Sequence, residues 1–147
     1  MNSLIQEIPQ LLIYKPAVLA LSVLCLAVLT QNFLCAPLAF LKGEQIPGEP
    51  LKGGHDFFSF RVIRTHMNSV ESLPVFGLAL IISILIGVNS SLVNWLAIIH
   101  VAFRLIFWAV YYSGIGVTAG GPRTLCFVGG LLCNIVLVIA CIQSFLF

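Results

Sequence analysis

Four polar residues precede a long apolar segment, and their spacing lets them share one helical face. Arg61, Arg64, Asn68 and Glu71 lie at positions i, i+3, i+7 and i+10, which places them along one side of an α-helix. Guanidinium groups hold carboxylates through paired hydrogen bonds, and a carboxylate can hold an ammonium group. The stripe therefore predicts a binding site for a small anionic zwitterion.

The position of Glu71 relative to the membrane strengthens this interpretation. The apolar run Leu73–Val88 that follows it covers only roughly 24 Å as a helix, whereas the hydrocarbon core of a bilayer is about 30 Å thick. A spanning helix must therefore extend backwards and carry Glu71 to membrane depth. Ionisable groups at that depth are costly unless they are paired or face a polar cavity. We interpret Glu71 as functional, and a purely structural ion pair with Arg104 is the alternative.

Two further arginines and a tyrosine are expected in the same half of the membrane. Counted from Leu92 at the start of the next apolar segment, Arg104 lies about 18 Å along the helix. Tyr111 lies two turns further on, and Arg123 begins the last apolar segment. Because a positively charged site lowers the pKa of a thiol, this region could also favour a nucleophilic thiolate.

The composition indicates a membrane protein. Hydrophobic residues make up 60% of the 147-residue chain and charged residues only 8%, against about 25% charged residues in a typical soluble domain. The net charge of +2 is too small to suggest a nucleic-acid partner. The five cysteines form no Cys-x-x-Cys pair, and His100 has no second ligand at metal spacing. We therefore predict no metal site and interpret His100 as a packing residue.

Four apolar segments are long enough to position these residues as membrane-spanning helices. We place the helices at about 16–41, 57–88, 92–112 and 124–147 of a single domain, 1–147. The fold class is thus an all-α membrane protein, a four-transmembrane-helix bundle. The connections before the second and fourth helices share a side and carry most of the basic residues, so the positive-inside rule places them in the cytosol. A bacterial inner membrane and the endoplasmic reticulum both fit this description.

The second-helix motif, Arg64-x-x-x-Asn68-x-x-Glu71-x-x-Pro74, resembles the signature of the MAPEG family, the membrane-associated proteins of eicosanoid and glutathione metabolism. The stretch from Arg104 to Tyr111 and the pair Arg123-Thr124 are also similar to the family's third helix and the start of its fourth. The resemblance covers nearly the whole chain. It departs from the family pattern at Phe107, where a histidine or tyrosine is common.

The resemblance implies a homotrimer and a glutathione transferase or peroxidase-like activity toward lipophilic electrophiles, with glutathione as co-substrate. A non-catalytic membrane protein of the same fold that binds lipid or serves as a scaffold is the alternative. Arg123, Thr124 and Tyr111 would act on the thiol. The residues that would bind glutathione are Arg64, Asn68, Glu71, Arg104 and Tyr111.

Overall fold

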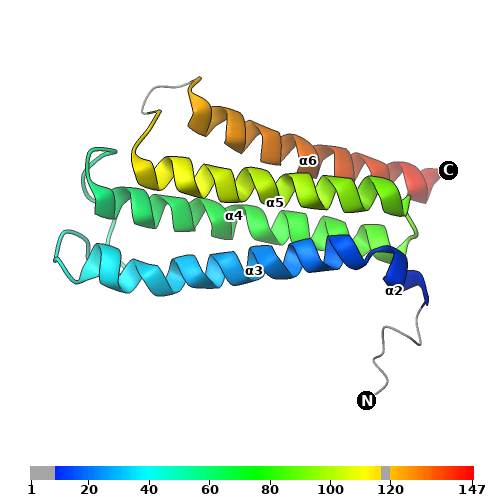
Figure 1. Ribbon diagram of the computed structural model, residues 1–147, viewed down its shortest axis with the longest axis horizontal. Helices are drawn as coiled ribbons and strands as arrows, with labels where there is room; N and C mark the ends of the chain where they lie inside the picture. Colours follow the sequence, from blue (N-terminus) through cyan, green and yellow to red (C-terminus); the bar gives the residue numbers. More distant parts are fainter. Residues whose placement is uncertain (1–8, 117–119) are drawn as a thin grey trace, which may run out of the picture.

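Four long helices run antiparallel in one bundle (Figure 1). The computed structural model describes residues 9–116 and 120–147 of the predicted 1–147 domain; residues 1–8 and 117–119 lie outside the described residues. A short helix, α2 (Pro9–Ile13), precedes the long ones. The long helices are α3 (Lys15–Cys35), α4 (Phe58–Leu85), α5 (Ser90–Ser113) and α6 (Pro122–Leu146), and a π-helical turn η1 (Ala36–Phe40) extends α3.

All four long helices are long and apolar enough to cross a membrane. This confirms the predicted all-α, four-span architecture, and the helix ends fall close to the predicted ones. The third span begins earlier than predicted because the Asn89 side chain caps it, accepting a hydrogen bond from the Leu92 amide at 3.1 Å. The fourth also begins earlier, with Pro122 in its first turn, where a missing amide hydrogen is harmless.

The first span does not break at Pro37, although proline usually interrupts an α-helix. The chain widens there into η1, and the Leu41 amide donates to the Ala36 carbonyl at 3.2 Å. Such single π-turns absorb a local mismatch without ending a helix. The helical path therefore continues to Phe40, next to the first long loop.

The central helices α4 and α5 each contact the three other long helices, and α3 and α6 lie on opposite sides of them (Figure 1). Small residues such as Ala17, Ala79 and Ala97 are buried where the helices meet, as expected for helices that associate by close packing in lipid. The buried cysteines Cys126, Cys133 and Cys141 lie among these packing residues.

Gly129 lets α6 approach α5. A Cβ atom at this position would lie 2.5 Å from the ring of Phe103, whereas one at Gly77 would meet only Leu21, at 3.7 Å. We expect Gly129→Ala to destabilise the fold by about 1–3 kcal/mol through overpacking. Thermal unfolding in detergent should show a lower Tm for this variant and no loss for Gly77→Ala. Equal Tm values would contradict a close α5–α6 contact at Gly129.

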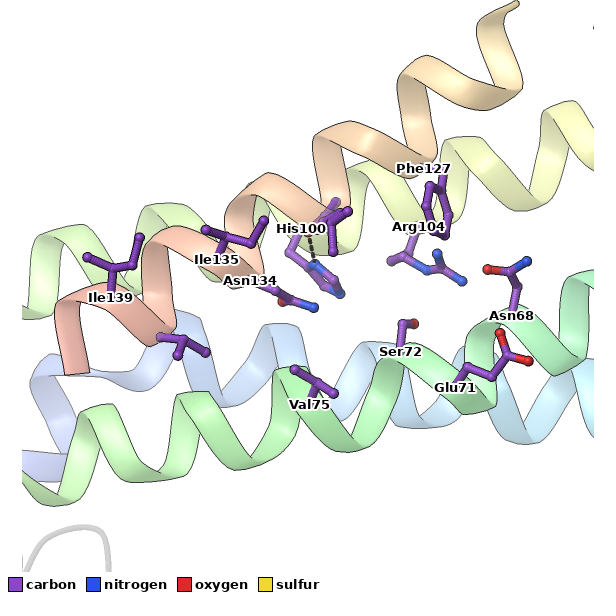
Figure 2. A pocket seen from close by; sticks show the side chains of 13 residues that line it. Asn68, Glu71, Ser72, Val75, His100, Arg104, Phe127, Asn134, Ile135 and Ile139 are labelled. Carbon is purple, nitrogen blue, oxygen red and sulfur yellow. Dashed lines mark hydrogen bonds between the residues drawn. The ribbon is translucent and has the colours of Figure 1, made fainter. Parts of the chain in front are cut away.

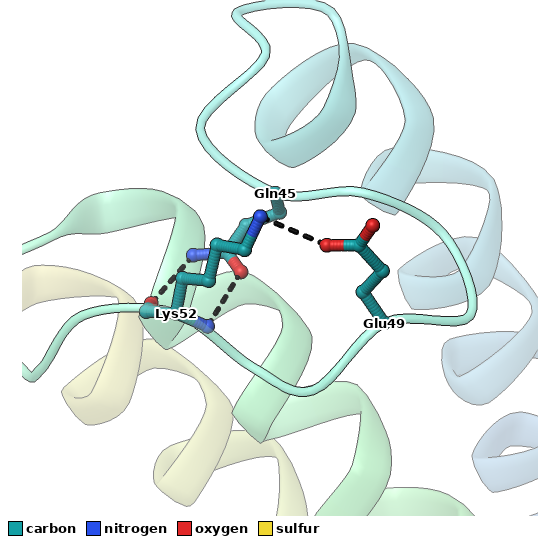
Figure 3. Close-up of polar contacts among 3 residues, drawn as sticks. All are labelled: Gln45, Glu49 and Lys52. Atoms are coloured by element: carbon teal, nitrogen blue, oxygen red, sulfur yellow. Dashed lines mark hydrogen bonds and ion pairs between the residues drawn. The ribbon is translucent and has the colours of Figure 1, made fainter.

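The two long connections, 41–57 and the one between α5 and α6, lie at the same end of the bundle (Figure 1). Their shared side was predicted; the cytosolic location of that side stays a prediction. Buried Gln45 organises the first loop: its Nε2 donates to the Lys52 carbonyl at 2.7 Å, and its Oε1 accepts from the Lys52 amide at 3.0 Å (Figure 3). An ion pair between Lys52 and Glu49, 2.8 Å long, closes the loop. His55 lies in this loop, at the end of the bundle where both long connections are found.

Candidate functional site

All seven residues that we predicted for the site from the sequence line one or both of two adjoining cavities. The loop-side cavity, of about 300 Å³, is lined by His55, Arg64, Asn68, Phe107, Tyr111, Arg123, Thr124 and Phe127. The inner cavity, of about 390 Å³, lies between α4, α5 and α6 and includes Glu71, His100, Arg104 and Asn134 in its lining. Asn68 and Phe127 line both cavities, so the two are neighbours along the bundle. Figure 2 shows both residues beside Arg104, at one end of the inner cavity.

The loop-side cavity is built around Arg123. This residue lies in the first turn of α6, and its guanidinium carbon lies 5.1 Å from the centre of the Tyr111 ring. Its Nη1 atom is 3.1 Å from the ring nitrogens of His55, and the rings of His55 and Tyr111 lie 5.3 Å apart. A cation, a phenol and an imidazole thus meet at the mouth of the site.

Thr124 and Arg64 complete this cavity from two helices. The Thr124 hydroxyl oxygen accepts a hydrogen bond from the Gly120 amide at 3.3 Å, which leaves the hydroxyl hydrogen able to donate. Arg64 is half-buried on α4, one helical turn before Asn68. The cavity therefore presents two guanidinium groups and several hydrogen-bond donors to a ligand.

Arg61, the first member of the polar stripe, lines neither of these cavities. Its Nη1 donates to the carbonyl oxygens of His55 and Asp56, at 2.6 and 3.2 Å. Arg61 thereby fastens the end of the first loop to α4 and holds His55 in place.

Glu71 and Arg104 face the inner cavity but do not pair with each other. Within the described part of the chain, no Glu71–Arg104 contact falls within the 4.0 Å limit for an ion pair. Glu71 is exposed on the single chain, whereas Arg104 is 5% exposed. The Arg104 Nη2 donates to the Ser69 hydroxyl at 3.4 Å, and its guanidinium carbon lies 5.0 Å from the centre of the Phe107 ring. The structural ion pair that the sequence left open is therefore not formed here, and both charges remain available to a ligand.

The sequence profile of the MAPEG family matches residues 17–143, from the first turn of α3 to the last turn of α6. The chain belongs to the MAPEG family. A comparison with curated protein sequences gives no match. Together with the four apolar helices, family membership makes the chain an integral, multi-pass membrane protein.

In this MAPEG protein, His55 lines the loop-side cavity and is a candidate site residue that sequence reasoning missed. It lies in a loop without periodicity, and its only signal was that its loop shares a side with Arg123. Burial lowers the pKa of His55, and the nearby guanidinium groups of Arg123 and Arg61 lower it further. At neutral pH the imidazole is therefore uncharged and can accept a hydrogen bond from Arg123.

The lowered pKa predicts acid sensitivity at the mouth of the MAPEG site. The unfolded chain, with a histidine pKa of about 6.5, binds the proton more readily than the folded one. The stability from neutral His55 is therefore present above that pH and is lost as the pH falls below it. We expect Tm, measured in detergent from neutral to mildly acidic pH, to fall less steeply in His55→Asn than in the wild type. If Tm falls equally with pH in the wild type and in His55→Asn, the neutral form of His55 does not contribute to stability.

Proposed function

We propose that the protein is a membrane glutathione transferase or peroxidase-like enzyme. One observation carries the proposal: a MAPEG-family chain gathers Arg64, Asn68, Tyr111, Arg123 and Thr124 around one cavity. Glutathione carries two carboxylates, one ammonium group and a thiol, and the two cavities offer a complementary partner for each.

Charge complementarity suggests how glutathione binds. Its carboxylates would meet the guanidinium groups of Arg64 and Arg104, because guanidinium groups bind carboxylates bidentately. Its ammonium group would meet Glu71, which is exposed beside the inner cavity. Asn68 lines both cavities and would hydrogen-bond the peptide between these ends.

Arg123 would hold the sulfur as a thiolate, assisted by hydroxyl donation from Thr124 or Tyr111. The thiol proton leaves to solvent. In transfer, the sulfur lone pair forms a carbon–sulfur bond with the electrophile, and the leaving group departs with its bonding electrons. In peroxide reduction, the sulfur attacks the outer oxygen, the oxygen–oxygen bond breaks and the alkoxide takes a proton. A second glutathione then converts the resulting sulfenic acid to the disulfide and water.

A homotrimer is part of the proposal. Asn68 is half-buried and Glu71 exposed on the single chain, and a neighbouring subunit over this face would enclose a ligand bound there. The mass of the detergent-purified protein, measured by native mass spectrometry, checks this: a trimer mass is expected, and a monomer mass alone would contradict it.

Calorimetric titration of the detergent-solubilised protein with glutathione tests the proposed function. We expect saturable binding at or below millimolar glutathione. The same titration distinguishes the enzyme from the alternative, a non-catalytic lipid-binding or scaffold protein. That protein would not need to bind glutathione. If no heat of binding is detected at millimolar glutathione, the proposed enzyme function is wrong.

A further inference from the structure

The imidazole of His55 lies against the guanidinium group at the centre of the loop-side cavity. Both of its ring nitrogens are 3.1 Å from the Nη1 atom of Arg123. Burial lowers the pKa of His55, and the charges of Arg123 and Arg61 lower it further. The ring is therefore neutral at neutral pH and has one acceptor nitrogen. Because the two distances are equal, either tautomer places that acceptor next to Nη1.

An anionic ligand atom that binds Arg123 from this side needs the position that His55 occupies. A carboxylate oxygen bound to a guanidinium nitrogen lies about 2.7–2.9 Å away, so it would overlap the imidazole. Tyr111 borders the guanidinium group as well, with its ring centre 5.1 Å from the Cζ atom of Arg123. Its ring is 5.3 Å from that of His55. His55 and an anionic ligand therefore compete for the same nitrogen.

The main chain of His55 is fixed by Arg61. The Nη1 atom of Arg61 donates to the carbonyl oxygens of His55 and Asp56, at 2.6 and 3.2 Å. Arg61 is itself packed against the end of α5, because a Cβ atom at Gly114 would lie 3.3 Å from its Cζ atom. These contacts hold the end of the first loop in place without involving the imidazole ring.

The side chain of His55 is the part of this arrangement that can move. It is partly exposed, and within the described residues Arg123 is the only hydrogen-bond partner of its ring nitrogens. Its other described contacts are with the rings of Phe60 and Tyr111. Rotation about the Cα–Cβ bond would take the ring toward solvent and leave the hydrogen bonds of the main chain to Arg61 intact.

We propose that His55 shields Arg123 in the unliganded protein, and that an anionic ligand replaces the imidazole when its ring rotates toward solvent. The apparent affinity of the ligand is then reduced by the fraction of molecules in which Arg123 is uncovered. The shielding itself does not depend on which anion binds. The further statement that the thiolate of glutathione displaces the ring rests on the proposed function.

Reaction with phenylglyoxal, an arginine-selective reagent, tests the shielding without glutathione. The full chain in detergent is treated with the reagent, and modification of each arginine is followed by peptide mass spectrometry. We expect His55→Ala to raise the rate at Arg123 about tenfold, the effect of losing one hydrogen bond to a charged group. Arg64 lines the same cavity and serves as the reference in the same sample, where its rate should not change.

His66 provides the matched control variant. It is a histidine of α4 that lines neither cavity, so His66→Ala should leave the rate at Arg123 as it is in the wild type. An unchanged or lower rate at Arg123 in His55→Ala would overturn the proposal. An equal rise at Arg64 and Arg123 would overturn it too, because the whole cavity would then have opened.

Calorimetric titration with glutathione tests the displacement. His55→Ala should bind glutathione about tenfold more tightly than the wild type, because no imidazole has to be moved. Equal affinities would show that glutathione does not displace His55. Faster modification of Arg123 in His55→Ala without any binding of glutathione would support the shielding and contradict only the proposed enzyme function.

Discussion

Replacing Arg123 with alanine is expected to lower the rate of glutathione conjugation to a generic aromatic electrophile about 10- to 100-fold at neutral pH. Arg123 lies over Tyr111 at the centre of the loop-side cavity, where its charge would favour the thiolate of bound glutathione. Without that charge the thiol pKa rises, and less of the bound glutathione is ionised. The loss should fall mainly on kcat, because other residues bind the carboxylates and the ammonium group.

The pH dependence separates this role from a structural one. Raising the pH should recover part of the activity of Arg123→Ala, because solvent hydroxide then ionises the thiol without help. Lys42→Ala removes a positive charge from an exposed residue outside both cavities and should leave the rate unchanged. Equal activity of wild type and Arg123→Ala would rule out the role assigned to Arg123.

Glu71→Gln is expected to weaken glutathione binding about tenfold or more, the effect of losing a hydrogen bond to a charged group. Glu71 makes no ion pair with Arg104 within the described residues. The substitution therefore removes a proposed ligand contact, and Arg104 does not lose an ion-pair partner. Calorimetric titration of wild type and variant measures the change.

A glutathione analogue that lacks the ammonium group makes this prediction specific. The wild type should bind the analogue more weakly than glutathione, and Glu71→Gln should bind the two about equally. Glu49→Gln is the matched control, because Glu49 pairs with Lys52 in the loop, outside both cavities. If Glu71→Gln still distinguishes the two ligands, the ammonium group is held elsewhere.

The helices and the grouping of several candidate residues on one helix face could be predicted because both follow from local periodicity. The turn spacing that joins Arg64, Asn68 and Glu71 on one face holds in α4, where Asn68 contributes to both cavities. The last helix was predicted to begin at residue 124, whereas α6 begins at Pro122, because proline is tolerated in a first turn; this start brings Arg123 to the mouth of the candidate site.

Features that depend on packing between distant segments could not be predicted in this way. His55 reaches Arg123 across 68 positions of sequence because Gln45 and Arg61 fold the first loop back onto α4. The approach of α6 to α5 at Gly129 likewise depends on how the two helices cross. His100 was interpreted as a packing residue, and its stack on Phe76 agrees with that, but only the three-dimensional arrangement shows that its Nε2 has no hydrogen-bond partner among the described residues.

The division of the candidate site into two cavities also depends on packing between distant segments and could not be predicted from the sequence. Sequence spacing placed Glu71 and Arg104 at a similar depth, and it could not show that Arg123, Tyr111 and Thr124 line a separate space nearer the loops. In the proposed function, the loop-side cavity would hold the thiol of glutathione, and Glu71 and Arg104 in the inner cavity would hold its ammonium group and a carboxylate.

The ultraviolet difference spectrum of glutathione bound to the wild-type protein at neutral pH tests the central claim most directly. Thiolate absorbs where the neutral thiol does not, so the spectrum reports the ionisation of the bound sulfur. The account predicts a thiolate signal that saturates with glutathione and is greatly reduced in Arg123→Ala. Saturable binding of glutathione without any thiolate signal would contradict it.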